Sequence, residues 1–214
     1  MRKTVLIATL LLLGIAQVMA QTTVTDIIKT IPQEILPYID DDQRKEINEF
    51  AGVQDTIEIK NSLNGTTRIF TANNSFAQID LNEAARLQIK LLPLNDSTQI
   101  VCLLKTVTKP VPDSEIRFYS TTWSPIASDF NLSLSNNADS LLAYFETDTM
   151  TVDEYEELKR SIEPVIISAD ISKDENAITF SLNIPLMSKD DYDSIKALIR
   201  QKTFKWNGKC FKIC

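Results

Sequence analysis

Residues 76–107 read FAQIDLNEAARLQIKLLPLNDSTQIVCLLKTV, and apolar and polar side chains largely alternate along this stretch. Successive side chains of a β-strand point to opposite faces of a sheet, so this period predicts strands. The period continues in both directions, and we expect six strands, at residues 55–59, 66–71, 76–81, 85–92, 99–107 and 115–122. Turn-forming residues such as Asn64-Gly65 and Asn95-Asp96 separate most of them, which is typical of an antiparallel meander.

Residues 21–50, which precede this sheet, predict two short helices. Thr25 is the expected cap of a helix at residues 26–30. The acidic residues 40–42 open a second helix at residues 43–50, because carboxylates favour the positive end of a helix dipole. Pro32 and Pro37 punctuate the segment between the two helices.

The C-terminal third contains two similar helical patterns, after a connection at residues 123–149 that is rich in Ser, Asn and Asp. Residues 150–162 align with residues 187–199, and each copy has a hydroxyl cap followed three residues later by an acid. Each copy precedes two strand-like runs, at residues 165–171 and 177–184 and then at 203–206 and 209–213. Asn207-Gly208 joins the last two as a strong hairpin signal. We interpret this as a tandem helix-strand-strand unit. The alternative is that the two stretches are not a repeat and are similar only because any acid-capped amphipathic helix has a sequence of this kind.

The predicted fold class is therefore α+β. An antiparallel meander sheet with N-terminal helices is followed by tandem helix-strand-strand units, whose helices cover one sheet face. We divide the chain into residues 21–122, the connection 123–149 and residues 150–214, and the alternative is one continuous domain.

The first 20 residues have the pattern of a secretory signal peptide. Arg2 and Lys3 precede an apolar run that is shorter than the roughly 20 residues needed to span a bilayer. We expect cleavage after Ala20, and the first residue of the mature chain would be Gln21 instead of the Cys that a lipid anchor requires. Processing removes two of the 22 basic residues and none of the 29 acidic ones, which leaves a net charge of −9. The sequence thus predicts a secreted or periplasmic protein without an integral membrane segment, whose acidic surface repels nucleic acid.

The residue types that carry most catalysis are scarce in this chain. It contains no histidine, the commonest general base and transition-metal ligand. Only Gly52, Gly65 and Gly208 follow the signal peptide, so no glycine-rich phosphate loop exists. The acidic clusters at residues 40–42 and 190–193 lack the glycine turn of a calcium loop. We expect no metal ion, no cofactor and no nameable catalytic residue; a hydrolase that acts on an envelope polymer through two carboxylates is an alternative.

The cysteines are Cys102, Cys210 and Cys214. On a strand at residues 209–213, Cys210 and Cys214 would point to one face about 13 Å apart, which is too far for a disulfide. A disulfide would therefore join Cys102 to Cys210 or to Cys214. Three unpaired thiols are the alternative.

Asp followed by Ser or Thr and then by an apolar residue or Thr recurs along the chain, whereas composition alone predicts about one such triplet. The triplet resembles the O-glycosylation signal of exported proteins of the Bacteroidetes. Ordinary turn and cap dipeptides are the alternative explanation. The predicted acceptors are Thr56, Ser97, Ser140, Thr149 and Ser194.

Residues 31–39 (IPQEILPYI), which run into residues 42–47 (DQRKEI), and residues 111–123 (VPDSEIRFYSTTW) resemble a Bacteroidales-restricted secreted family of unknown function. The signal peptide and the Met-Ser-x-Asp-Asp pattern that begins at Met187 also fit that family. The resemblance implies compartment and lineage, and it supplies no catalytic residues.

We expect a non-catalytic binding or interaction module of the cell envelope, which contacts an envelope protein or glycan through a sheet face or edge. Phe118, Tyr119 and Trp123 are candidate exposed aromatic contacts, although large side chains on strands more often pack in a core. A structural or assembly factor is a third hypothesis, beside the hydrolase. The binding hypothesis requires an exposed apolar or aromatic patch, or an open groove.

Overall fold

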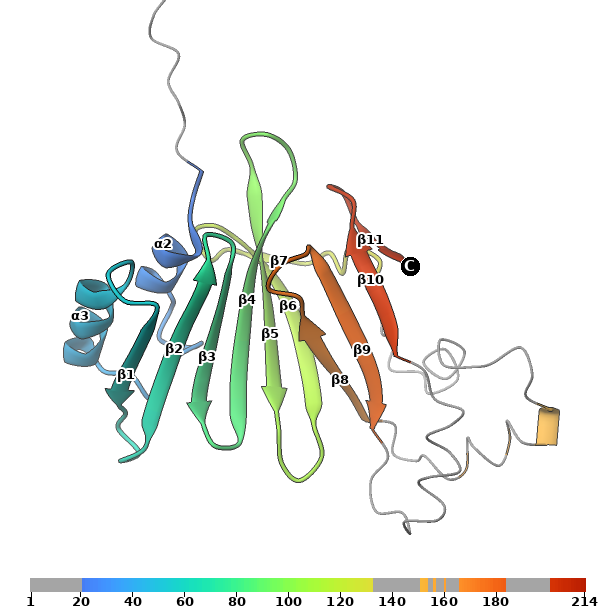
Figure 1. The fold of residues 1–214 in the computed structure, drawn as a ribbon, viewed down its shortest axis with the longest axis horizontal. Coiled ribbons are helices and arrows are strands. Elements are labelled where there is room, and N and C mark those ends of the chain that lie inside the picture. The colour runs from blue at the N-terminus through green and yellow to red at the C-terminus, as the bar shows by residue number, and fades with distance from the viewer. Residues whose placement is uncertain (1–20, 133–150, 154–155, 157–159, 161–165, 184–200) are drawn as a thin grey trace, which may run out of the picture.

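The computed structural model describes residues 21–132, 151–153, 156, 160, 166–183 and 201–214 (Figure 1). In these residues, two antiparallel sheets and two short helices form an α+β fold with more strand than helix. The seven-stranded sheet is a meander, because each strand pairs with the next along the chain. The six predicted strands are confirmed, and a two-residue strand, β7, follows them. The strands are β1 (Thr56–Lys60), β2 (Thr66–Asn73), β3 (Phe76–Asn82), β4 (Ala85–Pro93), β5 (Gln99–Val107), β6 (Asp113–Ser120) and β7 (Pro125–Ile126).

Both faces of the seven-stranded sheet carry a hydrophobic core. On the first face, residues directly opposite one another on four neighbouring strands are at most 5% exposed: Ile57, Ile69, Ile79 and Leu87. They belong to a first hydrophobic cluster with helices α2 (Val24–Lys29) and α3 (Asp41–Phe50). Leu104 and Phe118 point to the other face and join a second cluster. The sheet is therefore a central layer.

Each helix begins with a capping box. Thr23 Oγ1 accepts a hydrogen bond from Asp26 N (3.3 Å), and Asp26 Oδ2 accepts one from Thr23 N (2.9 Å). The predicted cap, Thr25, is wrong because Thr23 has an acid three residues later, in the position that completes the box. Asp40 and Gln43 form the second box, so α3 starts at Asp41, two residues before the predicted start.

Residues 31–39 link the two helices through turns, and we call them the strap. Arg44, on α3, holds the strap through its guanidinium group. Nη1 donates to the carbonyl of Ile31 (2.6 Å), Nη2 to that of Leu36 (3.3 Å), and Nε to Gln33 Oε1 (2.9 Å). One side chain thus satisfies acceptors along most of the strap.

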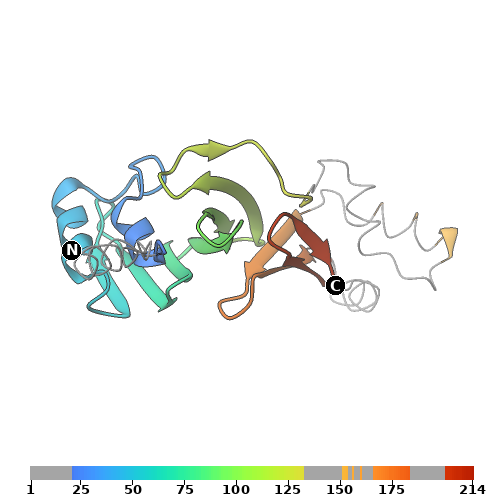
Figure 2. The same cartoon turned by 90° about the horizontal axis from the view of Figure 1, so that it is seen from above.

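The second sheet has four strands in the order β11-β10-β9-β8. Its strand β8 lies against β4, β5 and β6 of the large sheet, as the two views show (Figures 1 and 2). Both sheets contribute to the second hydrophobic cluster. Trp206 Nε1 also donates to the carbonyl of Pro93 (2.7 Å), which fixes one sheet to the other. The strands are β8 (Ile166–Ile171), β9 (Ala177–Asn183), β10 (Lys202–Trp206) and β11 (Phe211–Ile213).

The four strands predicted after residue 150 are confirmed, although β11 begins two residues later than expected. Gly208 has a φ of +94°, which suits the predicted Asn-Gly hairpin, and Asn207 N donates to the carbonyl of Cys210 (3.1 Å). The helices predicted at residues 150–162 and 187–199 lie largely outside the described residues, as do residues 133–149 of the predicted connection. Neither α2 nor α3 has the length and apolar run needed to cross a membrane.

Candidate functional site

The three aromatic residues expected to be exposed lie in the cores. Phe118, Tyr119 and Trp123 are 5%, 9% and 8% exposed, so the prediction of an aromatic contact surface there is wrong. Neighbouring residues of a strand point to opposite faces, and both faces of β6 are covered at Phe118 and Tyr119, so Phe118 joins the second cluster and Tyr119 the first. Trp123 packs edge-on against Tyr119 with ring centroids 5.4 Å apart, and its Nε1 donates to Thr30 Oγ1 (3.2 Å). These side chains join elements of the fold.

All three cysteines are free thiols, and the predicted bridge from Cys102 to Cys210 or Cys214 is not formed. Cys102 is fully buried on β5 and faces the second sheet. Burial raises the pKa of its thiol, because a thiolate there would lose its hydration. Cys210 is half-buried and Cys214 is exposed. Packing thus explains Cys102 without a disulfide.

Two of the predicted glycosylation acceptors, Thr56 and Ser97, lie exposed on the described surface. Thr56 begins β1. Ser97 lies in the β4–β5 loop, where Asn95 Oδ1 accepts hydrogen bonds from Ser97 N (3.0 Å) and Ser97 Oγ (3.1 Å) in a side-chain turn. Modification of both stays a prediction. The remaining acceptors, Ser140, Thr149 and Ser194, lie outside the described residues.

A groove of about 480 Å³ opens between the face of β2–β4 and the β8–β9 hairpin. Phe70 is 38% exposed in this groove and lies directly opposite Gln78 on β3. Amide, hydroxyl and charged side chains surround it. We call this hollow the inter-sheet groove, and it is lined by Phe70, Phe76, Gln78, Gln88, Asp170, Ile171, Ser172, Lys173, Asp174 and Thr179.

Gln88 fixes one wall of the inter-sheet groove. Its side chain is 5% exposed, Nε2 donates to Asp170 Oδ1 (2.9 Å), and Oε1 accepts from Ile171 N (3.0 Å). Ser114 Oγ accepts from Ala169 N (3.0 Å) in the same way. The outer edge of β8 is thus bonded to side chains of the large sheet, and the groove wall is preformed.

Lys90 anchors the turn between β8 and β9. It is 1% exposed, its Nζ donates to the carbonyl of Lys173 (3.0 Å), and it lies 5.9 Å from the centre of the Phe76 ring. Asn73 Nδ2 donates to the same carbonyl (2.8 Å). Burial lowers the pKa of Lys90, and the nearby charge of Asp174 opposes that shift.

A row of alternating charges lies on the same sheet face as the groove, and three of its members line a separate hollow. Glu58, Arg68, Asp80 and Arg86 lie directly opposite one another on β1 to β4. Glu58 Oε1 is 2.7 Å from Arg68 Nη2, and Asp80 Oδ1 is 3.3 Å from Arg86 Nε. The second contact is an ion pair without hydrogen-bond geometry, since Arg86 Nε has no hydrogen-bond partner among the described residues. The row carries no net charge, so it does not select an anionic or a cationic ligand.

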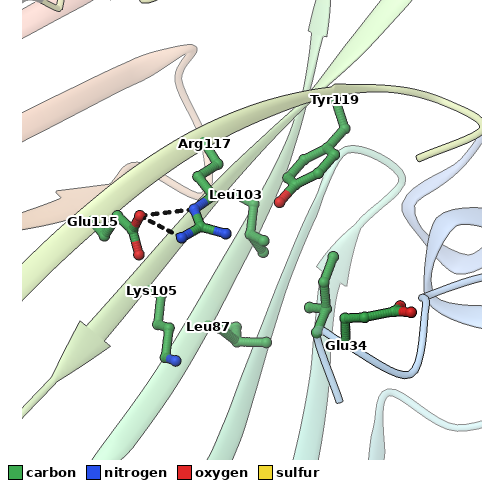
Figure 3. A pocket seen from close by; sticks show the side chains of 8 residues that line it. Glu34, Leu87, Leu103, Lys105, Glu115, Arg117 and Tyr119 are labelled. Atoms are coloured by element: carbon green, nitrogen blue, oxygen red, sulfur yellow. Dashed lines mark hydrogen bonds and ion pairs between the residues drawn. The ribbon is translucent and has the colours of Figure 1, made fainter. Parts of the chain in front are cut away.

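A small pocket of about 80 Å³ lies on the first face of the sheet, between the strap and β4–β6 (Figure 3). Leucine side chains form its floor and polar side chains form one wall. We call it the strap pocket, and it is lined by Glu34, Ile35, Leu87, Leu103, Lys105, Glu115, Arg117 and Tyr119.

The polar wall of the strap pocket centres on Arg117. Its Nε and Nη2 are each 2.7 Å from Glu115 Oε1. This bond to Glu115 raises the pKa of Arg117, and the hydroxyl of Tyr119 adds to the shift. Lys105 lies directly opposite Glu115 on the neighbouring strand and forms no ion pair with a described residue.

The sequence contained a signal for the inter-sheet groove at Phe70, but we selected the aromatic residues of and after β6 instead. In β2 the buried residues are Thr67 and Ile69, so Phe70 stands on the polar side of the alternation, beside Arg68. An aromatic residue on the polar side of an alternating strand indicates an exposed contact. The described residues hold no group of three or more acidic or cysteine side chains arranged for a metal ion.

Comparisons with known proteins agree with this fold. A family model described as "Protein of unknown function (DUF3256)" matches residues 15–211. A solved structure titled "Structure of a domain of an uncharacterized protein from Porphyromonas gingivalis W83" has a TM-score of 0.76 and 20% sequence identity, and the match covers 91% of this chain and 99% of that chain. At this identity the likeness shows the fold alone. The search of the curated proteins found no match.

Proposed function

We propose, from the premise that the chain belongs to the DUF3256 family of proteins of unknown function, that it is an exported, non-catalytic binding module of the cell envelope. The family match confirms the resemblance on which the lineage was predicted. The ligand is a glycan, and its site is the inter-sheet groove.

The exposed ring of Phe70 is the observation that carries this proposal. Sugar rings present flat C–H faces that pack on aromatic rings, and their hydroxyls hydrogen-bond to planar side chains. Gln78 lies directly opposite Phe70, and Asp170 and Asp174 line the same hollow. The groove thus combines one apolar platform with several acceptors, and its wall is already held in place by Gln88.

The charges favour a neutral glycan over a polyanion. The chain without its first 20 residues carries a net charge of −9, and the row on the same sheet face as the groove is balanced. A phosphorylated or nucleic-acid polymer would meet repulsion and no excess of cations. Because both sheets contribute to one cluster, we also propose that residues 21–122 and 150–214 act as one domain.

Binding to an array of neutral oligosaccharides tests the glycan proposal. Phe70→Ala should weaken binding at least tenfold. Tyr38→Ala is the matched control, because Tyr38 is 37% exposed against 38% for Phe70 but lies on the strap. Equal losses in both variants, or no binding by the unaltered protein, would refute the proposal. Binding of peptides instead of sugars would reassign the groove to protein recognition.

Export rests on the N-terminal pattern and has its own test. Sequencing the N-terminus of the native protein should give Gln21 as the first residue, and fractionation should place it outside the cytoplasm. Met1 on the native protein would contradict export. The intact mass of the same material tests glycosylation of Thr56 and Ser97, which predicts added hexose-type mass.

A further inference from the structure

The strap pocket differs in charge from the rest of this acidic protein. The whole chain has 29 acidic and 22 basic residues, yet two cations, Lys105 and Arg117, line this pocket together with its leucine floor (Figure 3). Both are exposed, on neighbouring strands. The fold does not require a cation pair at this place, because Lys105 forms no ion pair with a described residue.

The carboxylates of the pocket do not cancel this charge. Glu115 neutralises one cation, since a single oxygen, Oε1, receives both Nε and Nη2 of Arg117. Glu34 comes from the strap and directs its carboxylate away from Lys105 and Arg117 (Figure 3). Among the lining residues of β5 and β6, one positive charge therefore remains, with the ammonium of Lys105 and a terminal nitrogen of Arg117 as donors.

The floor sets the second requirement on a ligand. Leu87 and Leu103 are 1% and 4% exposed, and Ile35 closes the side toward the strap. The volume of about 80 Å³ is roughly half of the 150 Å³ that accommodates a benzene molecule, so the pocket has room for about three carbon atoms. An inorganic anion would leave this apolar surface without a partner.

We propose that the strap pocket binds a short aliphatic carboxylate, whose hydrocarbon part packs on Leu87 and Leu103 while its carboxylate accepts hydrogen bonds from Lys105 and Arg117. A carboxylate has two acceptor oxygens, one for Lys105 and one for the remaining terminal nitrogen of Arg117, and its single charge matches the surplus of one cation on β5 and β6. The same chemistry occurs in a free short-chain acid and in the C-terminal residue of a polypeptide. This site lies on the opposite face of the sheet from the inter-sheet groove and is independent of the glycan proposal.

Methyl NMR of the purified protein tests the site. Butanoate and N-acetyl-leucine represent the two sources of the carboxylate, and butanamide and N-acetyl-leucinamide are their uncharged counterparts. The methyl signals of Leu87 and Leu103 should shift with at least one acid at millimolar concentration, and at least tenfold more weakly with its amide. The acid that binds more tightly identifies the source.

Charge-removing variants complete the test. Lys105→Gln and Arg117→Gln should each weaken binding of the acid at least tenfold, and Lys212→Gln, an exposed lysine on β11, should leave it unchanged. Lys105→Gln removes no ion pair to a described residue, so it keeps the test valid if Arg117→Gln unfolds the protein. Equal binding of acids and amides, absence of leucine shifts with every compound, or unchanged affinity in Lys105→Gln would overturn the proposal.

Discussion

Gln88 joins the two sheets through both ends of its side-chain amide. Its Oε1 accepts from Ile171 N (3.0 Å), and its Nε2 donates to Asp170 Oδ1 (2.9 Å). Gln88 and Ile171 are 5% and 2% exposed, so water does not replace a lost acceptor easily. A buried donor left unsatisfied costs about 1–3 kcal/mol. Because the Asp170 residue is exposed, its carboxylate can be rehydrated, and the cost should come mainly from Ile171 N–H.

Gln88→Leu keeps most of the side-chain volume and removes the acceptor, so it should lower the free energy of unfolding by about 2 kcal/mol. Gln88→Ala should lower the free energy of unfolding by that amount and by a further contribution, because the shorter side chain leaves a cavity. Urea denaturation followed by tryptophan fluorescence measures both, because Trp206 lies in the core shared by the two sheets. If Gln88→Leu is as stable as the unaltered protein, Gln88 does not cap the edge of β8.

The pH dependence of the stability of Gln88→Glu distinguishes the contact with Asp170 from the hydrogen bond with Ile171 N. The new carboxylate can still accept from Ile171 N, but at neutral pH it faces the carboxylate of Asp170, which raises its pKa in the folded state. The folded state then binds more protons than the unfolded state, so the penalty is present at pH 7 and fades as the pH falls toward 4. A pKa rise of two units corresponds to about 2.7 kcal/mol at pH 7. Gln54→Glu, at an exposed position, should show no such pH dependence.

Further predictions concern the strap, the buried lysine and the first helix cap. Arg44→Lys should lower the free energy of unfolding by about 2 kcal/mol, because an ammonium cannot reach three separate acceptors; a urea titration showing no change would contradict that role. Burial lowers the pKa of Lys90, so its ammonium destabilises the folded state until it loses its proton. The stability of the unaltered protein relative to Lys90→Met should therefore increase as the pH rises above neutrality. A pH-independent difference in urea midpoints would show that burial does not perturb Lys90. Thr23→Ala should lower the free energy of unfolding by about 1 kcal/mol, measured by thermal or urea unfolding, and Thr25→Ala should lower it clearly less. A larger loss in Thr25→Ala would show that Thr25 caps the helix.

The strands could be predicted because their signals are local. In β4, Leu87, Ile89 and Leu91 recur at every second position and all lie in the first cluster. The Asn-Gly pair at residue 207 likewise fixed the β10–β11 hairpin, since the left-handed backbone at Gly208 needs no distant partner. The predicted start of helix α2 was two residues too late, because Thr23 and Thr25 are equally suitable cap residues until the position of Asp26 is considered.

The inter-sheet packing could not be predicted, because its signals are distant in sequence. The alternation of β4 puts Gln88 and Lys90 on the polar side, where a single sheet would expose them to water. The structure buries both, since their partners Ile171 and Lys173 come from a hairpin about 80 residues later in the chain. The same second layer explains why Phe118 is buried although it stands next to Tyr119, whose ring packs on the opposite face. The groove at Phe70 depends on the same second layer, because the β8–β9 hairpin forms its other side.

The edges of the two sheets indicate which kind of surface is available for binding. Unpaired strand edges recruit other strands, and proteins usually block them. In the described residues, α3 lies beside β1 and Gln43 Nε2 donates to the carbonyl of Lys60, while β7 has only two residues (Figure 1). Gln88 and Ser114 cap β8, and the carbonyl of Phe130 accepts from Phe211 N on β11. A partner that binds by adding a strand would have to displace one of these contacts, whereas a ligand on a sheet face displaces none. The arrangement therefore favours hollows on the sheet faces, such as the inter-sheet groove and the strap pocket, over any edge as the place where this protein meets its ligand.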